Sequence, residues 1–483
     1  MLKLRLEKSD CGNSEEKNTC IFEIQARPSD AIALAVRTKS TIWMLEEVFA
    51  EASIPVNEAA DIKDQDEFRR FLSDVKPADL IRHLKEDDQS MKTHLIYQIQ
   101  KTTNRAKEVR RQFGQGPRVS VFTLGTMRSI NSANQMHAVT KAAVLAGINH
   151  VETSPAYGPA ERFLGKVIQQ LQEENIEPLG GWVITSKILP GLNLKEGKEH
   201  IKSILERLGI NRIDNLAVHG LNLKEHLEWA LDGDGSDLLQ WAKEENLVGQ
   251  IGFSSHGSFA LVKQAIESNR FEFCSLHLHL LDQRKIPLAK IALSKGMGVI
   301  AISPADKGGQ LQNPSQTLIQ DCSPIKPLEL AYRFLLTEGI STLTVGAFEP
   351  KDLDLAKKLA NFVGPLNELE KRSINNLRKA MQSRLDKDLC KLCEACIPCP
   401  NNVPIPEILH LRNLLIGHDL KSFTQERYNL IGKAGHWGET INASSCEACG
   451  QCIPQCPNDL NIPMLLKETH KNLLSKPIKR LWG

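Results

Sequence analysis

The sequence has no long uninterrupted run of apolar residues. No stretch of about 18 apolar residues occurs anywhere in the chain, and a helix needs roughly that length to cross a bilayer. The first residues, MLKLRLEKSD, place no apolar segment behind a positive end, so they do not read as a secretory signal. We therefore expect a cytoplasmic protein that does not associate with membranes.

An excess of charge of one sign is also missing. Lys and Arg number 60 against 58 for Asp and Glu, which gives a net charge of +2. Nucleic acid and anionic membrane surfaces attract proteins with a large basic excess, so nucleic acid is not an expected partner. The length of 483 residues exceeds what one hydrophobic core supports and predicts two or three domains.

The cysteines are distributed unevenly. Of the twelve, eight occur in two short runs near the C-terminus, and the other four are Cys11, Cys20, Cys274 and Cys322. Clustering of this kind is typical of metal binding in a reducing compartment and not of a disulfide framework.

The sequence pattern divides the chain into four regions. Residues 1–90 hold a possible strand, CIFEIQA, and helical segments, the first of which begins near Pro28. Residues 91–117 are basic and predict a linker or an exposed helix. From 118 to 370, eight β-rich runs alternate with amphipathic segments, and from 371 to 483 the strands stop. We predict the α/β class, a (β/α)8 barrel with a small α+β N-terminal segment and a mainly helical C-terminal domain.

The eight predicted strands are mostly apolar, as strands covered on both faces should be. In chain order they are VSVFTLG, HVETSP, WVITSKI, NLAVHG, QIGFSS, FCSLHLH, VIAISPA and TLTVGA. Two of the segments between them show helical stripes: Phe163, Leu164, Val167, Ile168 and Leu171, and then Ile201, Ile204, Leu205 and Leu208, with Gly209 as the stop.

Each cysteine run has the spacing of iron-sulfur ligands. Two residues separate consecutive cysteines, except that three separate the last pair of the second run, and a proline follows the last cysteine of each run. In two-cluster ferredoxins, the last cysteine of each run binds the other run's cluster. We therefore predict two [4Fe-4S] clusters, one held by Cys390, Cys393, Cys396 and Cys456 and the other by Cys446, Cys449, Cys452 and Cys399.

A pair of structural zinc sites is the alternative, because four cysteines can also bind zinc. The trailing prolines fit zinc poorly, although the spacing of two residues before Cys399 departs from the usual three. Between the two cysteine runs we expect a helix that has Pro406 in its first turn and ends at Gly417. This spacer resembles the α-helical ferredoxin modules of electron-transfer subunits.

Four residues suited to carbonyl chemistry follow three successive strands. Glu152 and Tyr157 follow the second strand, Lys187 the third and His219 the fourth, at the end of the barrel where active sites lie. A lysine ammonium near the Tyr157 oxygen would lower the pKa of the phenol, and Glu152 would keep Lys187 charged. His219 would then position the carbonyl by a hydrogen bond.

The segments around these residues resemble a known family. HVETSPAYGPAERFLG, VITSKI and DNLAVHG look like the active-site segments of the aldo/keto reductases, and SPADKGGQL and TVGAFEPKDL look like their cofactor-binding loops. The resemblance runs from about Gly114 to about Asn367 and is closest to the branch fused to iron-sulfur segments. It implies hydride transfer between NADP(H) or NAD(H) and a small carbonyl or alcohol substrate. The family usually has Asp where this chain has Glu152.

The same resemblance implies residues that hold the nicotinamide cofactor. They are Ser254, Ser255, Ser275, Ser303, Gly346 and Lys351. Asp352 stands where NADP-preferring members often have Arg, and Ala356 replaces a typical Asn, so the choice between NADP and NAD stays open. His277 and His279 alternate along the sixth predicted strand, where they either line the pocket or fill the barrel interior.

The N-terminal region is similar to the second half of the bifunctional nuclease domain, through IFEIQARPSDAIALAVRTKSTIWMLEEV. Arg27, Asp30 and Arg37 match its motif, and Asp30 is equally suited to capping a helix. We expect an adaptor or dimerising piece, not an active nuclease.

Nicotinamide passes two electrons as hydride, whereas each cluster passes one, and no segment reads as a site for the flavin that usually mediates between them. Three functions stay open. The first is a reductase with clusters as sensor or structural support. The second is a redox protein that takes electrons from a ferredoxin or another carrier without nicotinamide turnover, and the third is a redox-responsive scaffold.

Overall fold

The computed structural model describes residues 2–8, 20–26, 109–362, 364–432 and 441–475. They belong to two compact units, Met1–Ser90 and Met91–Gly483. In the first unit, β1 (Leu2–Lys8) pairs antiparallel with β2 (Cys20–Ala26). The sequence CIFEIQA thus forms the predicted strand. The predicted helix near Pro28, and Arg27, Asp30 and Arg37, lie outside the described residues.

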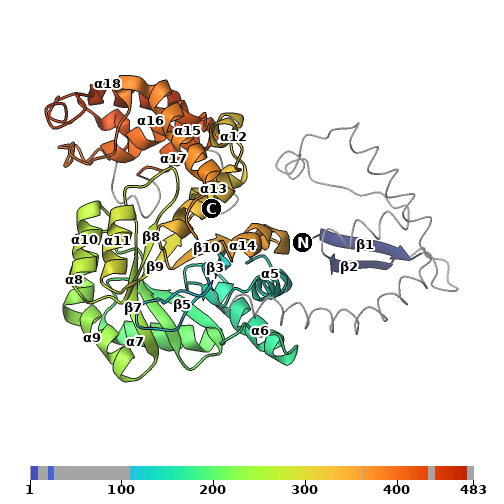
Figure 1. Cartoon of the computed structure of the whole chain (residues 1–483). Coiled ribbons are helices and arrows are strands. Elements are labelled where there is room, and N and C mark those ends of the chain that lie inside the picture. Colours follow the sequence, from blue (N-terminus) through green and yellow to red (C-terminus); the bar gives the residue numbers. More distant parts are fainter. Residues whose placement is uncertain (1, 9–19, 27–108, 363, 433–440, 476–483) are drawn as a thin grey trace. The chain divides into compact units, whose positions relative to one another are not determined.

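The second unit contains a closed barrel of eight parallel strands, which confirms the predicted fold (Figure 1). Each strand pairs with the next in chain order, and the last pairs with the first. The strands are β3 (Phe122–Gly125), β4 (His150–Glu152), β5 (Val183–Ile188), β6 (Ile213–Val218), β7 (Val248–Ser255), β8 (Phe273–His277), β9 (Gly298–Ile302) and β10 (Thr342–Gly346).

Helices lie outside the barrel and pack their apolar stripes against it. They are α5 (Ala133–Leu145), α6 (Ala160–Glu173), α7 (Leu194–Leu208), α8 (Lys224–Leu231), α9 (Gly233–Glu244), α10 (Phe259–Glu267), α11 (Ile286–Ser294), α12 (Gln316–Cys322), α13 (Pro327–Thr337) and α14 (Asp354–Leu359). Short 3-10 turns are η2 (Thr126–Arg128), η3 (Lys307–Gln312) and η4 (Pro350–Leu353). Helix α7 starts at a capping box of Asn193 and Glu196 and ends at Gly209 in the left-handed region, as the sequence predicts.

Residues 109–117, at the end of the predicted linker, close the barrel at the N-terminal ends of its strands. Phe113 is fully buried there, and its ring lies 5.3 Å from that of Phe273, the first residue of β8. The Arg111 guanidinium donates hydrogen bonds to the carbonyls of Ile340 and Leu336. This end of the barrel is therefore sealed by the chain that leads into it.

A hydrogen-bonded polar layer fills the barrel interior near the same end. The His150 ring binds Thr123 through Nδ1 at 2.8 Å and Thr185 through Nε2 at 2.7 Å. Asn215 Nδ2 donates to Thr185 at 3.1 Å, and Gln250 Nε2 donates to Asn215 at 2.8 Å. Burial lowers the pKa of His150 to about 3, so this histidine is neutral and serves as part of the core.

The C-terminal region is helical, as predicted. Its elements are α15 (Glu368–Leu385), η5 (Asp386–Asp388), α16 (Ile405–His418), α17 (Lys421–Tyr428), η7 (Ala443–Ser445) and α18 (Ile462–Leu473). Pro406 lies in the first turn of α16, but Gly417 does not end that helix, which continues to His418. A Cβ at Gly417 would lie 3.1 Å from Met381, so this glycine permits the close packing of α15 on α16.

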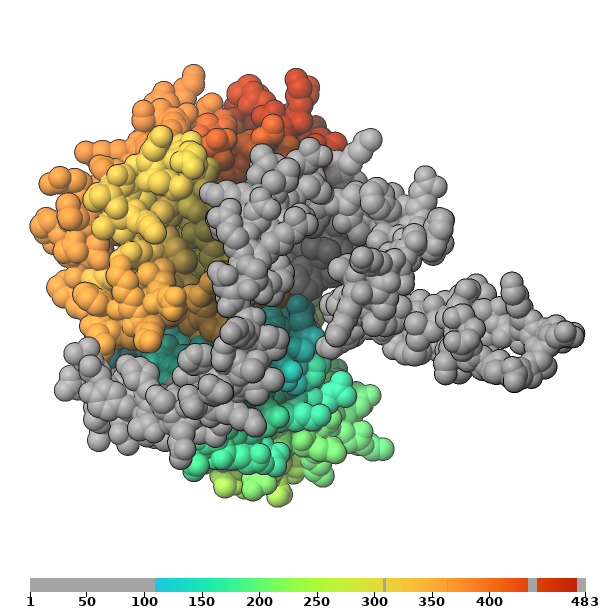
Figure 2. All heavy atoms as spheres, turned by 90° about the vertical axis from the view of Figure 1, so that its right-hand side faces the viewer, coloured from blue at the N-terminus to red at the C-terminus, as the bar shows by residue number. Residues whose placement is uncertain are grey.

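The C-terminal helices share part of their core with the barrel. Ile374 and Leu377 of α15 and Leu414 of α16 belong to the same hydrophobic cluster as the barrel helices. Two ion pairs add to this junction. Arg333 of α13 forms a buried pair with Glu370, and Asp321 of α12 forms a partly buried pair with Arg384. In Figure 2, the yellow segment near residue 320 adjoins the orange C-terminal helices. The boundary predicted at residue 370 lies inside α15.

Among the described residues, no helix is both long and apolar enough to span a membrane.

Candidate active site

Neighbouring barrel strands bring the four predicted catalytic residues to one end of the barrel. Glu152 is the last residue of β4, Lys187 the penultimate residue of β5, and His219 directly follows β6. Tyr157 lies in the loop between β4 and α6. Because parallel strands end on the same side of a barrel, residues that are distant in sequence converge there.

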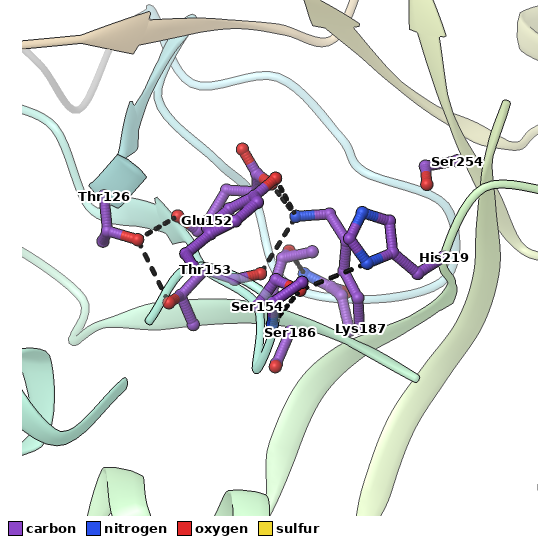
Figure 3. A network of polar contacts seen from close by, with 12 residues as sticks. Thr126, Glu152, Thr153, Ser154, Ser186, Lys187, His219 and Ser254 are labelled. Carbon is purple, nitrogen blue, oxygen red and sulfur yellow. Dashed lines mark hydrogen bonds and ion pairs between the residues drawn. The ribbon is translucent and has the colours of Figure 1, made fainter. Parts of the chain in front are cut away.

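Three of the four side chains form one hydrogen-bonded group. Figure 3 shows the Lys187 amine against the Glu152 carboxylate, with His219 beside them. Lys187 Nζ contacts Glu152 Oε1 and donates to the Tyr157 hydroxyl at 2.9 Å and to the Thr153 carbonyl at 3.0 Å. The Tyr157 hydroxyl lies 3.2 Å from Glu152 Oε1. Lys187 is only 3% exposed, so its three donors are used within the protein.

His219 lies beside this group. Its Nδ1 is 3.2 Å from the Ser154 hydroxyl, and its ring meets that of Tyr157 edge-on, with the centroids 6.1 Å apart. Burial, helped by the charge of Lys187, lowers the pKa of His219 to about 4. The imidazole is therefore neutral at pH 7 and offers one N–H and one acceptor nitrogen.

The ionisation of this group differs from the sequence-based expectation. We expected Lys187 to lower the pKa of Tyr157, whereas burial raises the pKa of Tyr157 to about 12. Burial also lowers the pKa of Lys187 to about 7. Desolvation opposes both the phenolate of Tyr157 and the ammonium of Lys187. The phenol therefore keeps its proton at neutral pH, and the lysine titrates close to neutral pH.

Two of the serines expected to contact nicotinamide already make hydrogen bonds within the protein. Ser254 Oγ accepts from the backbone of Gly220 at 2.9 Å, and Ser255 Oγ donates to the carbonyl of Leu221 at 2.6 Å. These two residues thereby hold the loop after β6, which carries His219.

Ser275 differs from them. It lies on β8, is 1% exposed, and its hydroxyl has no hydrogen-bond partner among the described residues. Buried hydroxyls are rarely left without a partner, so this one fits a contact with a bound group.

The remaining cofactor candidates lie on the last two strand–helix connections of the barrel. Ser303 directly follows β9 and has a φ of 54°, in the left-handed region. Gly346 ends β10, and a Cβ there would lie 3.1 Å from the Arg128 side chain. Lys351 is exposed and pairs with Glu349 at 2.6 Å.

The eight C-terminal cysteines line two adjoining hollows. Cys390, Cys393, Cys396 and Cys456 line one hollow, and Cys396, Cys399, Cys446, Cys449 and Cys452 line the other. Apart from Cys396, which borders both, these are the two sets predicted from the spacing. A separate apolar core contacts six of the cysteines.

Thiols gathered in this way are poorly suited to ionise by themselves. Burial, with the neighbouring thiols of Cys390, Cys393 and Cys452, raises the pKa of Cys396 to about 12. Burial also raises the pKa of Cys390 and Cys452. A bound metal reverses this effect, because a coordinating thiol loses its proton.

The sequence analysis missed several residues near the two histidines of the sixth barrel strand. Strand β8 ends at His277, so His279 lies beyond the strand, and the two do not alternate along it. Their ring centroids are 4.8 Å apart. Asp306, Asp282 and His410 lie close to them. The H-x-H pattern was the only signal in the sequence, because the other three residues are distant along the chain.

Comparisons with known proteins identify families that match two regions of the chain. The sequence profile of the aldo/keto reductase family matches residues 122–378, and that of the bifunctional nuclease domain matches residues 6–57. An aldo-keto reductase from Mycolicibacterium vanbaalenii is 27% identical over 207 residues, which cover 41% of this chain and 68% of that protein.

Solved structures of an aldo-keto reductase from Bacillus halodurans are also similar. The holo form has a TM-score of 0.47 and 18% identity over 55% of this chain and 95% of that chain. The apo form has a TM-score of 0.46 and 20% identity over 55% of this chain and 94% of that chain.

Proposed function

Because the chain belongs to the aldo/keto reductase family of oxidoreductases, we propose that it transfers hydride between a nicotinamide cofactor and a small carbonyl or alcohol substrate, with Tyr157 as the proton donor. The observation that carries this proposal is the 2.9 Å contact between Lys187 Nζ and the Tyr157 hydroxyl, with Glu152 against the same lysine. Carbonyl reduction needs a proton at oxygen, and a phenol next to an ammonium can supply it.

Each member of the group has a distinct role in this proposal. Tyr157 keeps its proton at neutral pH because burial raises the pKa of its phenol to about 12. When the proton leaves, the nearby Lys187 ammonium stabilises the phenolate. Glu152 fixes the lysine, and neutral His219 hydrogen-bonds the substrate oxygen without adding charge.

The nicotinamide cofactor, NADP(H) or NAD(H), would be held by Ser254, Ser255, Ser275, Ser303, Gly346 and Lys351. It supplies or accepts the hydride when bound. The buried Ser275 hydroxyl, which lacks a partner among the described residues, supports this assignment most directly. Lys351 directly precedes Asp352, one of the two replaced positions, so we propose it as the residue that favours NADP.

We also propose two [4Fe-4S] clusters in the C-terminal region, bound by the crossed sets of cysteines given above. The gathering of these eight thiols in two hollows supports a metal ligand set. Such clusters pass one electron at a time, and a ferredoxin or another small electron carrier is the proposed partner.

For the N-terminal region, which matches the bifunctional nuclease domain, we propose an adaptor or dimerising role.

The reductase proposal is tested by replacing Tyr157 with Phe. We expect the rate of NADPH or NADH oxidation with simple aldehydes to fall by about 10²–10⁴, because proton donation is lost. Tyr332→Phe is the matched control, because Tyr332 is buried on α13 against Phe122. The activity of this variant should stay close to that of the unchanged protein. Equal activity of Tyr157→Phe and Tyr332→Phe would refute the assigned role.

The cluster proposal is tested on anaerobically purified protein. We expect a brown preparation that absorbs broadly near 400 nm, with about eight iron atoms per chain and no stoichiometric zinc. A colourless preparation containing zinc would instead favour structural zinc sites. Reduction of the clusters by a ferredoxin without consumption of NAD(P)H would favour a redox protein that takes electrons from a carrier without nicotinamide turnover.

A further inference from the structure

A second group of potential ligands lies at the same end of the barrel as the proposed catalytic residues. His277 ends β8, His279 follows two residues later, and Asp306 follows β9. One ring nitrogen of each histidine and one carboxylate oxygen of Asp306 lie within 4.8 Å of one another. The proposed carbonyl reduction uses none of these three residues.

The spacing of His279 and Asp306 suits two ligands that share an ion. Nitrogen and oxygen ligands bind divalent transition metals at about 2.0–2.2 Å, which puts adjacent ligand atoms roughly 3.0–3.5 Å apart. His279 Nε2 lies 3.5 Å from Asp306 Oδ1, longer than the roughly 2.7–3.2 Å of a normal N–H···O hydrogen bond. One ring nitrogen of His277 lies within 4.8 Å of the ligand atoms that His279 and Asp306 offer.

Burial gives an independent reason to expect a ligand here. His279 is 2% exposed and Asp306 5% exposed. The Nδ1 atom of His279 is buried and has no hydrogen-bond partner among the described residues. Buried polar atoms nearly always have a partner, so a bound group is expected next to His279.

A second set, His279, Asp282 and His410, also lies within 4.8 Å, but its carboxylate is paired with a guanidinium. Arg284 donates to both oxygens of Asp282, from Nε at 2.9 Å and from Nη2 at 2.7 Å. The guanidinium would also repel a cation bound beside it. The first set is therefore the better metal site.

We propose that His277, His279 and Asp306 bind one divalent transition-metal cation, such as Fe²⁺, Mn²⁺ or Zn²⁺, at the mouth of the barrel. Two imidazoles and one carboxylate form a ligand set that leaves coordination positions open. Water or an oxygen-bearing small molecule can bind at those positions. The inference does not rest on the proposed reductase function or on the iron-sulfur clusters.

The test titrates Mn²⁺ into the full-length protein, which is used as purified with its bound groups. Electron paramagnetic resonance measures the concentration of free Mn²⁺. Mn²⁺ is the probe because carboxylates suit it and the C-terminal thiolates do not. We expect one saturable site per chain. Asp306→Asn and His277→Gln should each weaken binding at least tenfold, whereas the matched changes Asp282→Asn and His410→Gln should leave the affinity unchanged.

Three results would overturn the proposal. They are the absence of saturable binding in the unchanged protein, equal affinity in all variants, and a loss confined to Asp282→Asn and His410→Gln. Thermal unfolding is the second measurement, for the case that a variant folds poorly. An ion that binds only the folded state raises the unfolding temperature. Mn²⁺ should therefore stabilise the unchanged protein and the two control variants but not Asp306→Asn.

Discussion

At the residue scale, the ionisation of Lys187 links pH to the proposed reaction. Burial lowers the pKa of Lys187 to about 7, whereas an exposed lysine titrates near 10.4. Below pH 7 the ammonium is present and can stabilise the phenolate that Tyr157 becomes. Above pH 7 the amine is neutral, and this stabilisation is lost.

We therefore predict that kcat/KM for reduction falls as the pH rises through about 7, by up to about tenfold per pH unit. The measurement is a pH profile from pH 5 to 9 with saturating NADPH. Glu152→Gln removes the carboxylate that contacts Lys187 and should move the fall to lower pH. A flat profile across this range would contradict the role of Lys187.

At the scale of secondary structure, close helix packing depends on two glycines in different surroundings. Gly165 lies in α6, and a Cβ there would approach the backbone carbonyls of Arg207 and Leu208 at 2.7 Å. Gly417 lies in α16, where a Cβ would approach the Met381 side chain at 3.1 Å. Backbone cannot yield as a flexible methionine can.

The two alanine variants should therefore behave differently. Gly165→Ala should lower the free energy of unfolding by about 1–3 kcal/mol, because overpacking outweighs the better helix propensity of alanine. Gly417→Ala is the matched control and should change stability by less than about 1 kcal/mol. Denaturant unfolding of both variants checks this, and equal effects would show that the α6–α7 contact relaxes freely.

At the scale of the whole second unit, the junction between the barrel and the C-terminal helices contains a buried charged group. Asp321 of α12 accepts from Arg384 Nη2 of α15 at 2.8 Å and lies 3.1 Å from His418 Nδ1 of α16. Although burial opposes ionisation, the hydrogen bonds from Arg384 and His418 hold the pKa of Asp321 below its ordinary value. This carboxylate thus stabilises the fold above its ordinary pKa, and the contribution is lost as the pH falls.

We predict that Arg384→Gln destabilises the protein by about 1–3 kcal/mol at pH 7, because Asp321 and the Gly417 carbonyl lose their cationic donor. Unfolding midpoints measured from pH 7 to pH 3 should also fall less steeply in the variant than in the unchanged protein. Lys371→Gln, which removes an exposed pair with Glu368, is the control and should change stability little. An unaltered pH slope in Arg384→Gln would refute the linkage.

The sequence by itself determined the barrel, because eight apolar strands that alternate with amphipathic helices have few other ways to bury their surfaces. It also placed Glu152, Lys187 and His219 at strand ends, since strand position follows from local pattern. The sequence did not determine the end of α16. Gly417 is typical of a helix stop, but it lies inside the helix and makes a packing contact with α15 that local sequence does not encode.

Only the tertiary structure decided the ionisation of the site and the partners of its residues. The sequence suggested that charge would lower the pKa of Tyr157, but burial raises that pKa to about 12, and burial depends on every element packed around the phenol. The two groups that share His279, one with His277 and Asp306 and the other with Asp282 and His410, likewise bring together residues from strand ends and a C-terminal helix. No local pattern encodes such proximity, because it arises from how the chain closes on itself in three dimensions.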